Sequence, residues 1–139
     1  MNARDHTFAT ALNCMDGRFQ LPVNEAVRSI FDVAYVDTIT EAGIVKFLSD
    51  QTGAPETRTA LASIRISLDH HGSRGIAVAA HADCAGNPYG EQRQTKQLGQ
   101  AVHFLEEQFP GRRVVGLWVN IDGVARIVAS APGKKPGSA

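Results

Sequence analysis

The sequence predicts an α/β fold with a mostly parallel central sheet, helices on both faces and a late antiparallel edge strand. Short apolar runs alternate along the chain with segments whose apolar residues recur at helical spacing, and strands that alternate with helices form parallel sheets covered on both faces. The run Ile76–Ala80 is apolar throughout, which is typical of a strand buried on both faces. The last two apolar runs are separated only by Asn120–Gly123, a turn sequence that favours an antiparallel closing strand.

In the first half of the chain, the first predicted strand is Phe8–Leu12, and Cys14 lies just past its end. A helix follows, because Pro22 is tolerated in a first helical turn and apolar residues then recur at helical spacing. Those residues are Val23, Ala26, Val27, Ile30 and Phe31. Val33–Ile39 is the second predicted strand, and the turn-forming segment Ser49–Thr57 is expected to be a loop.

In the second half, another predicted helix ends at Gly72, with His70 and His71 in its last turn, where positive charge suits the helix dipole. Its apolar positions are Leu61, Ile64, Ile66 and Leu68. After the third strand, the polar stretch Asn87–Lys96 leads into a helix. The apolar face of that helix carries Leu98, Ala101, Val102, Leu105 and Phe109. Val114–Val119 and Val124–Ala129 are the last two predicted strands.

Length and composition limit the possible functions. A chain of 139 residues suits a single domain with its own core, which we place at residues 1–131; residues 132–139 lack core-forming side chains and are predicted to be disordered. The 14 Lys and Arg balance 14 Asp and Glu, so no net charge attracts nucleic acid or an anionic membrane. No apolar stretch approaches the roughly 18 residues of a membrane span, and we see no signal peptide. We therefore expect a cytoplasmic protein that acts on a small molecule.

Two groups of reactive side chains follow predicted strands. Cys14, Asp16 and Arg18 alternate along the chain, so on an extended or gently turning backbone they would face a common space. His81 and Cys84 follow the third strand at His-x-x-Cys spacing. Ligands of parallel sheets lie beyond the carboxyl ends of the strands. We therefore expect both groups at the same edge of the sheet.

Together these residues predict a zinc site. Two thiolates and one imidazole, from Cys14, His81 and Cys84, suit zinc, and three protein ligands leave a fourth position open, as catalytic zinc requires. Asp16 would then lie within reach of that position, and Arg18 could hold it by two parallel hydrogen bonds. Zinc lowers the pKa of a bound water to near 7, and a neighbouring carboxylate could orient the resulting hydroxide toward an electrophile.

Structural interpretations of the same residues stay open. Cys14 and Cys84 could be buried small hydrophobic residues or could form one disulfide. Asp16 and Arg18 could be only an ion pair that braces the loop. Such an ion pair would not exclude zinc.

Other polar residues are expected to have simpler roles. Asp83 is expected to cap a turn rather than to contact the metal, and Glu41 to be a solvated or interface charge. His6, His70, His71 and His103 lack partners at ligand spacing. Either His70 or His71 could relay protons, but solvation at a helix end is the favoured interpretation.

At these residues the chain resembles the beta-class carbonic anhydrases. That family carries Cys-x-Asp-x-Arg after its first strand and His-x-x-Cys after its third, and this chain has CMDGR at 14–18 and HADC at 81–84. The likeness runs from about Phe8 to Ala129. It implies that Cys14, His81 and Cys84 are the zinc ligands and that Asp16 and Arg18 form the catalytic dyad. The implied activity is reversible hydration of carbon dioxide to bicarbonate by a zinc-bound hydroxide.

The chain also departs from the family pattern. The family's Arg-Asn-Ala-Gly-Asn loop stands here as Thr40-Glu41-Ala42-Gly43-Ile44. Only a few residues precede the first predicted strand, where many family members have helices that embrace a partner, so we expect a compact, divergent member. In the family the substrate pocket is built at a dimer interface, so the resemblance implies a homodimer or higher homo-oligomer with the 40–44 loop near the contact. Two other functions stay open: hydrolysis of carbon disulfide or carbonyl sulfide at the same site, and a non-catalytic zinc-binding protein. Retention of Asp16 and Arg18 argues against the latter.

Overall fold

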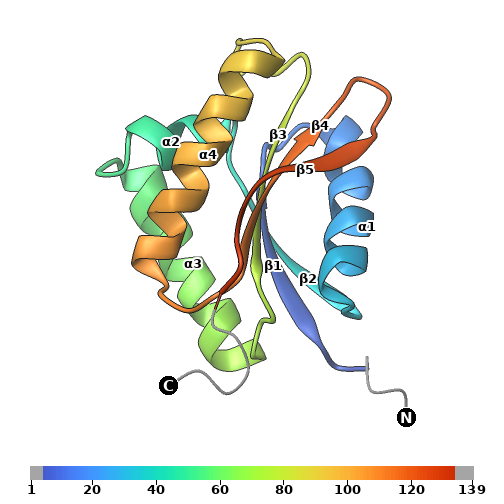
Figure 1. The fold of residues 1–139 in the computed structure, drawn as a ribbon, viewed down its shortest axis with the longest axis vertical. Coiled ribbons are helices and arrows are strands. Elements are labelled where there is room, and N and C mark those ends of the chain that lie inside the picture. The colour runs from blue at the N-terminus through green and yellow to red at the C-terminus, as the bar shows by residue number, and fades with distance from the viewer. Residues whose placement is uncertain (1–4, 134–139) are drawn as a thin grey trace.

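Five strands form one sheet in the order β2-β1-β3-β4-β5 in the computed structural model, which describes residues 5–133 (Figure 1). The strands are β1 (Phe8–Asn13), β2 (Tyr35–Thr40), β3 (Ile76–His81), β4 (Val114–Val119) and β5 (Ala125–Ala131). The first four run parallel, and β5 pairs antiparallel with β4. The predicted α/β fold, with its antiparallel edge strand, is confirmed.

Helices cover both faces of this sheet (Figure 1). They are α1 (Gln20–Phe31), α2 (Ile44–Asp50), α3 (Pro55–His71) and α4 (Glu91–Gln108). The α1 helix packs on one face, and the other three helices share the opposite face. Successive side chains of a strand point to opposite faces of the sheet, so β3 contributes to the hydrophobic core on each face. Ala77 and Ala79 pack in the core under α1, whereas Ile76 and Val78 pack in the core under α3 and α4.

Two sequence-based boundaries on the α2–α4 face are wrong. The segment predicted as a loop, Ser49–Thr57, contains the end of α2 and the first turn of α3, and Pro55 lies at the start of α3, where a missing N–H costs nothing. The polar stretch Asn87–Lys96 is helical from Glu91 onward. Its polarity is misleading because Gln94 and Gln97 are buried against the loop after β3 rather than exposed to solvent.

The helix α2 was not predicted, and the other differences are small. The second and fifth strands begin one or two residues later than predicted, and α3 ends at Gly72 as expected, with φ of +61°.

No helix within residues 5–133 is both long enough and apolar enough to cross a membrane. The disordered tail was predicted for residues 132–139, of which 134–139 lie outside the described residues.

The loops that follow β1, β2 and β3 meet at one edge of the sheet. The contact between the second and third of these loops is unusually close, because a Cβ on Gly43 would lie 2.6 Å from the backbone of Gly86. A Cβ on Gly86 would in turn lie 2.8 Å from the backbone of Ala42 and Gly43. Gly43 also has φ of +60°, which disfavours any residue with a side chain. The absence of side chains at both glycines allows these two loops to pack backbone to backbone.

This packing predicts that Gly43→Ala is much more destabilising than Gly72→Ala. Both glycines have a positive φ, but a Cβ on Gly72 meets nothing within 4 Å. Gly72→Ala should therefore cost only the conformational strain, about 1 kcal/mol. Gly43→Ala adds a backbone clash and should cost about 3 kcal/mol or more. Urea unfolding of the two metal-free variants measures the difference, and equal losses would show that the loops can separate at little cost.

Candidate metal centre

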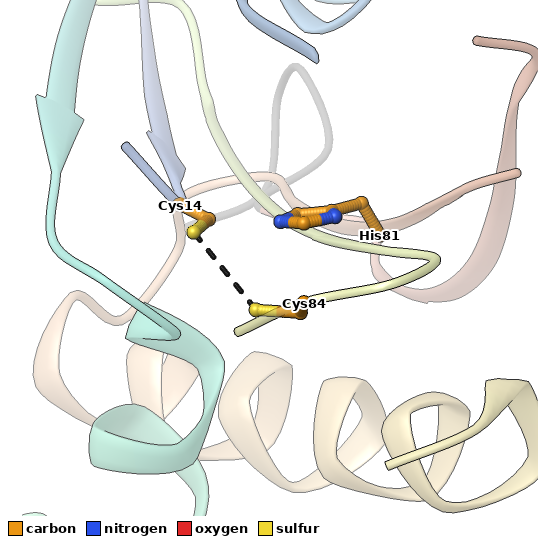
Figure 2. A group of neighbouring side chains, drawn as sticks. All are labelled: Cys14, His81 and Cys84. Atoms are coloured by element: carbon orange, nitrogen blue, oxygen red, sulfur yellow. Dashed lines mark hydrogen bonds between the residues drawn. The ribbon is translucent and has the colours of Figure 1, made fainter. Parts of the chain in front are cut away.

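Cys14, His81 and Cys84 converge in a buried cluster (Figure 2). Cys14 follows β1, His81 is the last residue of β3, and Cys84 lies in the loop that β3 enters. Their candidate ligand atoms all lie within 4.8 Å of one another. The two sulfurs are 3.9 Å apart, and both cysteines are free, since a disulfide needs about 2.05 Å. The structure therefore brings together the three residues that the sequence predicted as metal ligands.

The imidazole of His81 is prepared to act as a ligand through one specific nitrogen. Its Nδ1 lies 2.7 Å from the carbonyl oxygen of Ala82; a carbonyl only accepts, so Nδ1 carries the proton and Nε2 carries the free lone pair. Nε2 is buried and has no hydrogen-bond partner among the described residues. The ring of Phe19 stacks on the imidazole at 4.3 Å. A cation in the cluster would satisfy this otherwise unpaired atom.

The Cys84 thiol is hard to ionise without a cation. Burial raises the pKa of the Cys84 thiol and the neighbouring Cys14 raises it further, whereas the backbone N–H groups of Asn87 and Gly86 partly oppose the shift. The backbone N–H of Gly43 donates to the sulfur of Cys14 at 3.4 Å. A divalent ion would offset the repulsion between two thiolates. The donor set of two sulfurs and one imidazole fits zinc, with a fourth position left open.

Asp16 and Arg18 form a bidentate ion pair beside this cluster. Arg18 Nε donates to Asp16 Oδ1 at 3.1 Å, and its Nη2 donates to Oδ2 at 2.7 Å. The contact arises from a 3-10 turn at Gly17–Phe19, in which Asp16 also accepts the backbone N–H of Arg18. The prediction was that an extended or gently turning backbone would bring the two side chains to a common space, and the backbone geometry in that prediction is wrong. A tight turn brings them together instead.

The ion pair changes the acidity of both partners. Hydrogen bonds from the side chain and then the backbone of Arg18 lower the pKa of Asp16 to about 2, and His81 adds a smaller electrostatic contribution in the same direction. The pKa of Arg18 is raised by Asp16 first and by Asp83 second. Asp16 is two residues from Cys14, and its partner Arg18 contacts Asp83, the neighbour of Cys84, so the ion pair lies near the cluster. Asp16 is thus an ionised acceptor at neutral pH.

Asp83 has a different role from the predicted turn cap. Its carboxylate accepts from Arg18 Nη1 at 3.2 Å, and its backbone oxygen accepts from Nη2 at 3.1 Å. Asp83 has φ of +54°, a conformation that aspartate tolerates better than most residues. Arg18 consequently uses four of its five N–H donors to connect the loop after β1 with the loop after β3.

Sequence analysis missed the polar residues that brace these loops. Gln20 donates to the backbone oxygens of Cys14 and Asp16, both at 2.8 Å, and accepts from Asn13 at 3.0 Å. On the other side, Gln94 donates to the backbone oxygen of His81 at 3.0 Å. Amide side chains occur throughout a sequence, so no motif signals these roles. They are recognisable only once the loops have folded around them.

The remaining candidates lie outside the cluster. Glu41 is exposed, which agrees with its expected role as a solvated or interface charge. His71 is not simply solvated at the end of its helix, because its Nδ1 lies 2.7 Å from the carboxylate of Asp37. His103 pairs with Glu107 one helical turn away. None of these contacts connects a histidine with the cluster.

Sequence comparison assigns the family. The family model described as "Putative carbonic anhydrase" matches residues 4–129, and the chain belongs to that family. No curated protein matches the sequence significantly. The resemblance to carbonic anhydrases inferred from the two motifs is confirmed at the level of the family.

Solved structures of beta-carbonic anhydrases share the fold. A carbonic anhydrase from Streptococcus mutans aligns with a TM-score of 0.58 and 20% identity, covering 86% of this chain and 80% of that one. A tetrameric beta-carbonic anhydrase from Sordaria macrospora aligns with a TM-score of 0.59 and 12% identity, covering 88% of this chain and 81% of that one. Beta-carbonic anhydrase isoform I from Trichomonas vaginalis aligns with a TM-score of 0.56 and 16% identity, covering 96% of this chain and 87% of that one. At such low identity these matches establish the fold alone.

The lowered pKa of Asp16 predicts an acid-sensitive contribution to stability. The ordinary value is 3.8 and the folded value is about 2, so ionised Asp16 stabilises the fold above about pH 4 and this contribution is lost as the pH falls toward 2. In the metal-free protein, Asp16→Asn should cost about 1 kcal/mol at pH 6, because the pair is partly exposed. The cost should shrink toward zero near pH 2.

Urea unfolding across this pH range tests the expectation. Asp122→Asn is the matched control, since Asp122 lies in the β4–β5 turn and its carboxylate has no ion pair among residues 5–133. A difference between Asp16→Asn and the parent that stays constant from pH 6 to pH 2 would contradict the assignment.

Proposed function

We propose that this chain is a zinc-dependent carbonic anhydrase that reversibly hydrates carbon dioxide to bicarbonate. The observation that carries the proposal is the buried Cys14–His81–Cys84 cluster with an ionised carboxylate, Asp16, held beside it by Arg18. A metal site that only stabilised the fold would need neither of these two charged residues. Membership in the carbonic anhydrase family supports the same assignment.

Cys14, His81 and Cys84 would hold the zinc ion. When bound, zinc would lower the pKa of water at its open position to about 7 and so make hydroxide available at neutral pH. His81 would bind through Nε2, because Nδ1 is committed to the backbone of Ala82. Both cysteines would bind as thiolates, which makes zinc affinity depend on pH.

Asp16 would orient the nucleophile rather than remove its proton. A carboxylate whose pKa is about 2 is a weak base at neutral pH but a good hydrogen-bond acceptor. By accepting a hydrogen bond it would aim the oxygen lone pair at the carbon of the substrate. Arg18 would keep this acceptor fixed and ionised, and the proton released by the overall reaction would pass to solvent or buffer.

Stopped-flow measurement of carbon dioxide hydration by the zinc-loaded protein tests the proposal. Arg18→Ala should lower kcat/KM by about 10-fold or more, because it releases the residue that orients the nucleophile, while zinc content stays at one ion per chain. Arg126→Ala is the matched control, since Arg126 is similarly exposed and pairs with Glu91. Cys84→Ser should lose both zinc and activity.

The outcomes separate the alternatives. Zinc bound without hydration of carbon dioxide would overturn the proposed substrate, and parallel assays with carbonyl sulfide and carbon disulfide would then identify a hydrolase of those compounds. Inactivity with all three would leave a non-catalytic zinc protein. A folded protein that contains no metal and has a Cys14–Cys84 disulfide would overturn the zinc site itself.

We also propose that the chain functions as a symmetric dimer with the 40–44 loop near the contact. Two features support an interface along β2. This strand lies at an edge of the sheet, where unpaired backbone groups favour association. Tyr35, at the start of this strand, is 51% exposed, and Ile66 of α3, which lies beside the strand, is 56% exposed.

Sedimentation velocity at about 10 µM should therefore give a dimer, since most soluble oligomers are symmetric and use one self-complementary surface. Ile66→Lys places a charge beside the β2 edge and should shift the protein toward monomer. Ile121→Lys changes a similarly exposed isoleucine, 58% exposed, in the β4–β5 turn and should leave the dimer intact. A fully active monomer would contradict this proposal.

A further inference from the structure

One side chain of α4 closes the loop that carries Cys84. This loop, residues 82–90, leads from His81 at the end of β3 to the start of α4. Gln94 Nε2 donates to the backbone oxygen of His81 at 3.0 Å and to that of Tyr89 at 2.7 Å. These two carbonyl groups flank the segment that contains Cys84. The two N–H donors of a single amide therefore hold the two ends of the loop together.

A second buried amide holds the middle of the same loop. The backbone N–H of Asn87 donates to the backbone oxygen of Cys84 at 3.3 Å and so closes a turn beyond this cysteine. The side chain of Asn87 donates to Gln97 Oε1 at 2.7 Å, and the same nitrogen lies 3.4 Å from Gln94 Oε1. The α4 helix consequently contacts the loop at its beginning, its middle and its end.

Burial makes these hydrogen bonds difficult to replace. Gln94 is 0% exposed, Asn87 is 1% exposed and Gln97 is 5% exposed. Water therefore has little access to the two carbonyl groups that Gln94 binds, and a buried polar group without a partner is costly. Both N–H donors of Gln94 are used within the loop, so a side chain without donors would leave two backbone oxygens unpaired.

The backbone that Gln94 holds also determines where the imidazole lies. The peptide group between His81 and Ala82 is bonded on both sides, because its carbonyl accepts from Gln94 and its N–H donates to the backbone oxygen of Val119 at 3.0 Å. The next carbonyl, that of Ala82, accepts from His81 Nδ1 and leaves Nε2 free. The backbone that orients the imidazole is thus held from β4 on one side and from α4 on the other.

We propose that Gln94 is a positioning residue of the metal centre, which holds the two ends of the loop 82–90 so that His81 and Cys84 are ready to bind one metal ion. The inference rests on zinc binding as proposed above. Without this closure the loop would have to become ordered when the metal binds, and the entropy lost would lower metal affinity. Outer residues that orient metal ligands commonly change metal affinity by about 10- to 100-fold.

Competition with a chelator tests this role independently of catalysis. Gln94→Met keeps an unbranched side chain of similar length and removes the donors, and it should weaken zinc binding about 10-fold. The matched control is Gln97→Met, which changes a buried amide three residues further along α4. Gln97 bonds to a side chain of the loop and not to its backbone, so the control should keep the zinc affinity of the parent.

A spectroscopic readout separates positioning from general stabilisation. With cobalt in place of zinc, the visible absorption bands report the arrangement of ligands around the metal, so they should shift in Gln94→Met and persist in Gln97→Met. Urea unfolding of the metal-free variants should show that both substitutions lower stability, because each leaves buried polar groups unpaired. Gln94→Asn, whose amide is one methylene short of the two carbonyl groups, replaces Gln94→Met should the latter not fold, and the same changes are expected.

The results distinguish this inference from the proposed function. A parent that binds zinc, together with a Gln94→Met variant of equal affinity and an unchanged cobalt spectrum, would overturn the role of Gln94 and leave the zinc site standing. Equal losses of affinity in Gln94→Met and Gln97→Met would also overturn it, because the loss would then follow from lowered stability rather than from an open loop. A parent that binds no zinc would overturn both.

Discussion

The placement of two cysteine sulfurs 3.9 Å apart in a buried site is the constraint on which the rest of this structure depends. Two thiolates at that distance repel each other, and burial removes the water that would otherwise solvate them. The fold supplies one backbone N–H to this pair, that of Gly43, which donates to the sulfur of Cys14. Gly43 reaches Cys14 while its loop lies against the loop of Cys84, and this is possible because Gly43 and Gly86 meet without side chains.

Charge around the centre balances without a metal ion and would stay balanced with a divalent one, because two thiolates would offset the charge of the ion. At neutral pH, Asp16 and Asp83 are negative, and metal binding would add two thiolates. Arg18 and Lys46 supply two positive charges, each bound to the loop that follows β3. A zinc ion would supply the other two. The two side-chain cations approach that loop from different elements, Arg18 from the turn after β1 and Lys46 from α2. The loop is therefore held by two charged side chains.

The sequence was sufficient to predict the sheet and the convergence of Cys14, His81 and Cys84 because both depend on local patterns. An apolar run such as Ile76–Ala80 identifies a buried strand, and parallel strands place their carboxyl ends at one edge whatever the details of the loops. The start of α4 was missed because Gln94 is polar and yet buried, donating to the backbone of His81. A pattern of apolar residues cannot reveal a helix turn that packs against polar backbone.

The contacts of Asp83 and Lys46 were missed for a related reason. Each depends on a partner distant in the sequence, Arg18 for the first and Gly86 for the second. Neither residue type is unusual in a turn or on a helix surface, so nothing local distinguishes them from solvated charges. Asp16 and Arg18 were found because they are two residues apart, although the geometry that joins them is a tight turn and not the alternation inferred.

The departures from the resembled family's loop acquire a physical explanation at this centre. Of the residues Thr40-Glu41-Ala42-Gly43-Ile44, the two that agree with the family pattern, Ala42 and Gly43, are those whose backbone lies against Gly86. The differing residues have side chains that act elsewhere: Glu41 is exposed, and Ile44 is buried in the core at the start of α2. Contact with the metal loop is therefore made by the backbone, which any sequence can supply once a glycine permits the approach. Side chains in the same loop can change charge and size without altering the N–H that reaches Cys14. The cysteine–histidine cluster and the surface around it are to this extent separable, so a divergent surface at Glu41 is compatible with an intact Cys14–His81–Cys84 cluster.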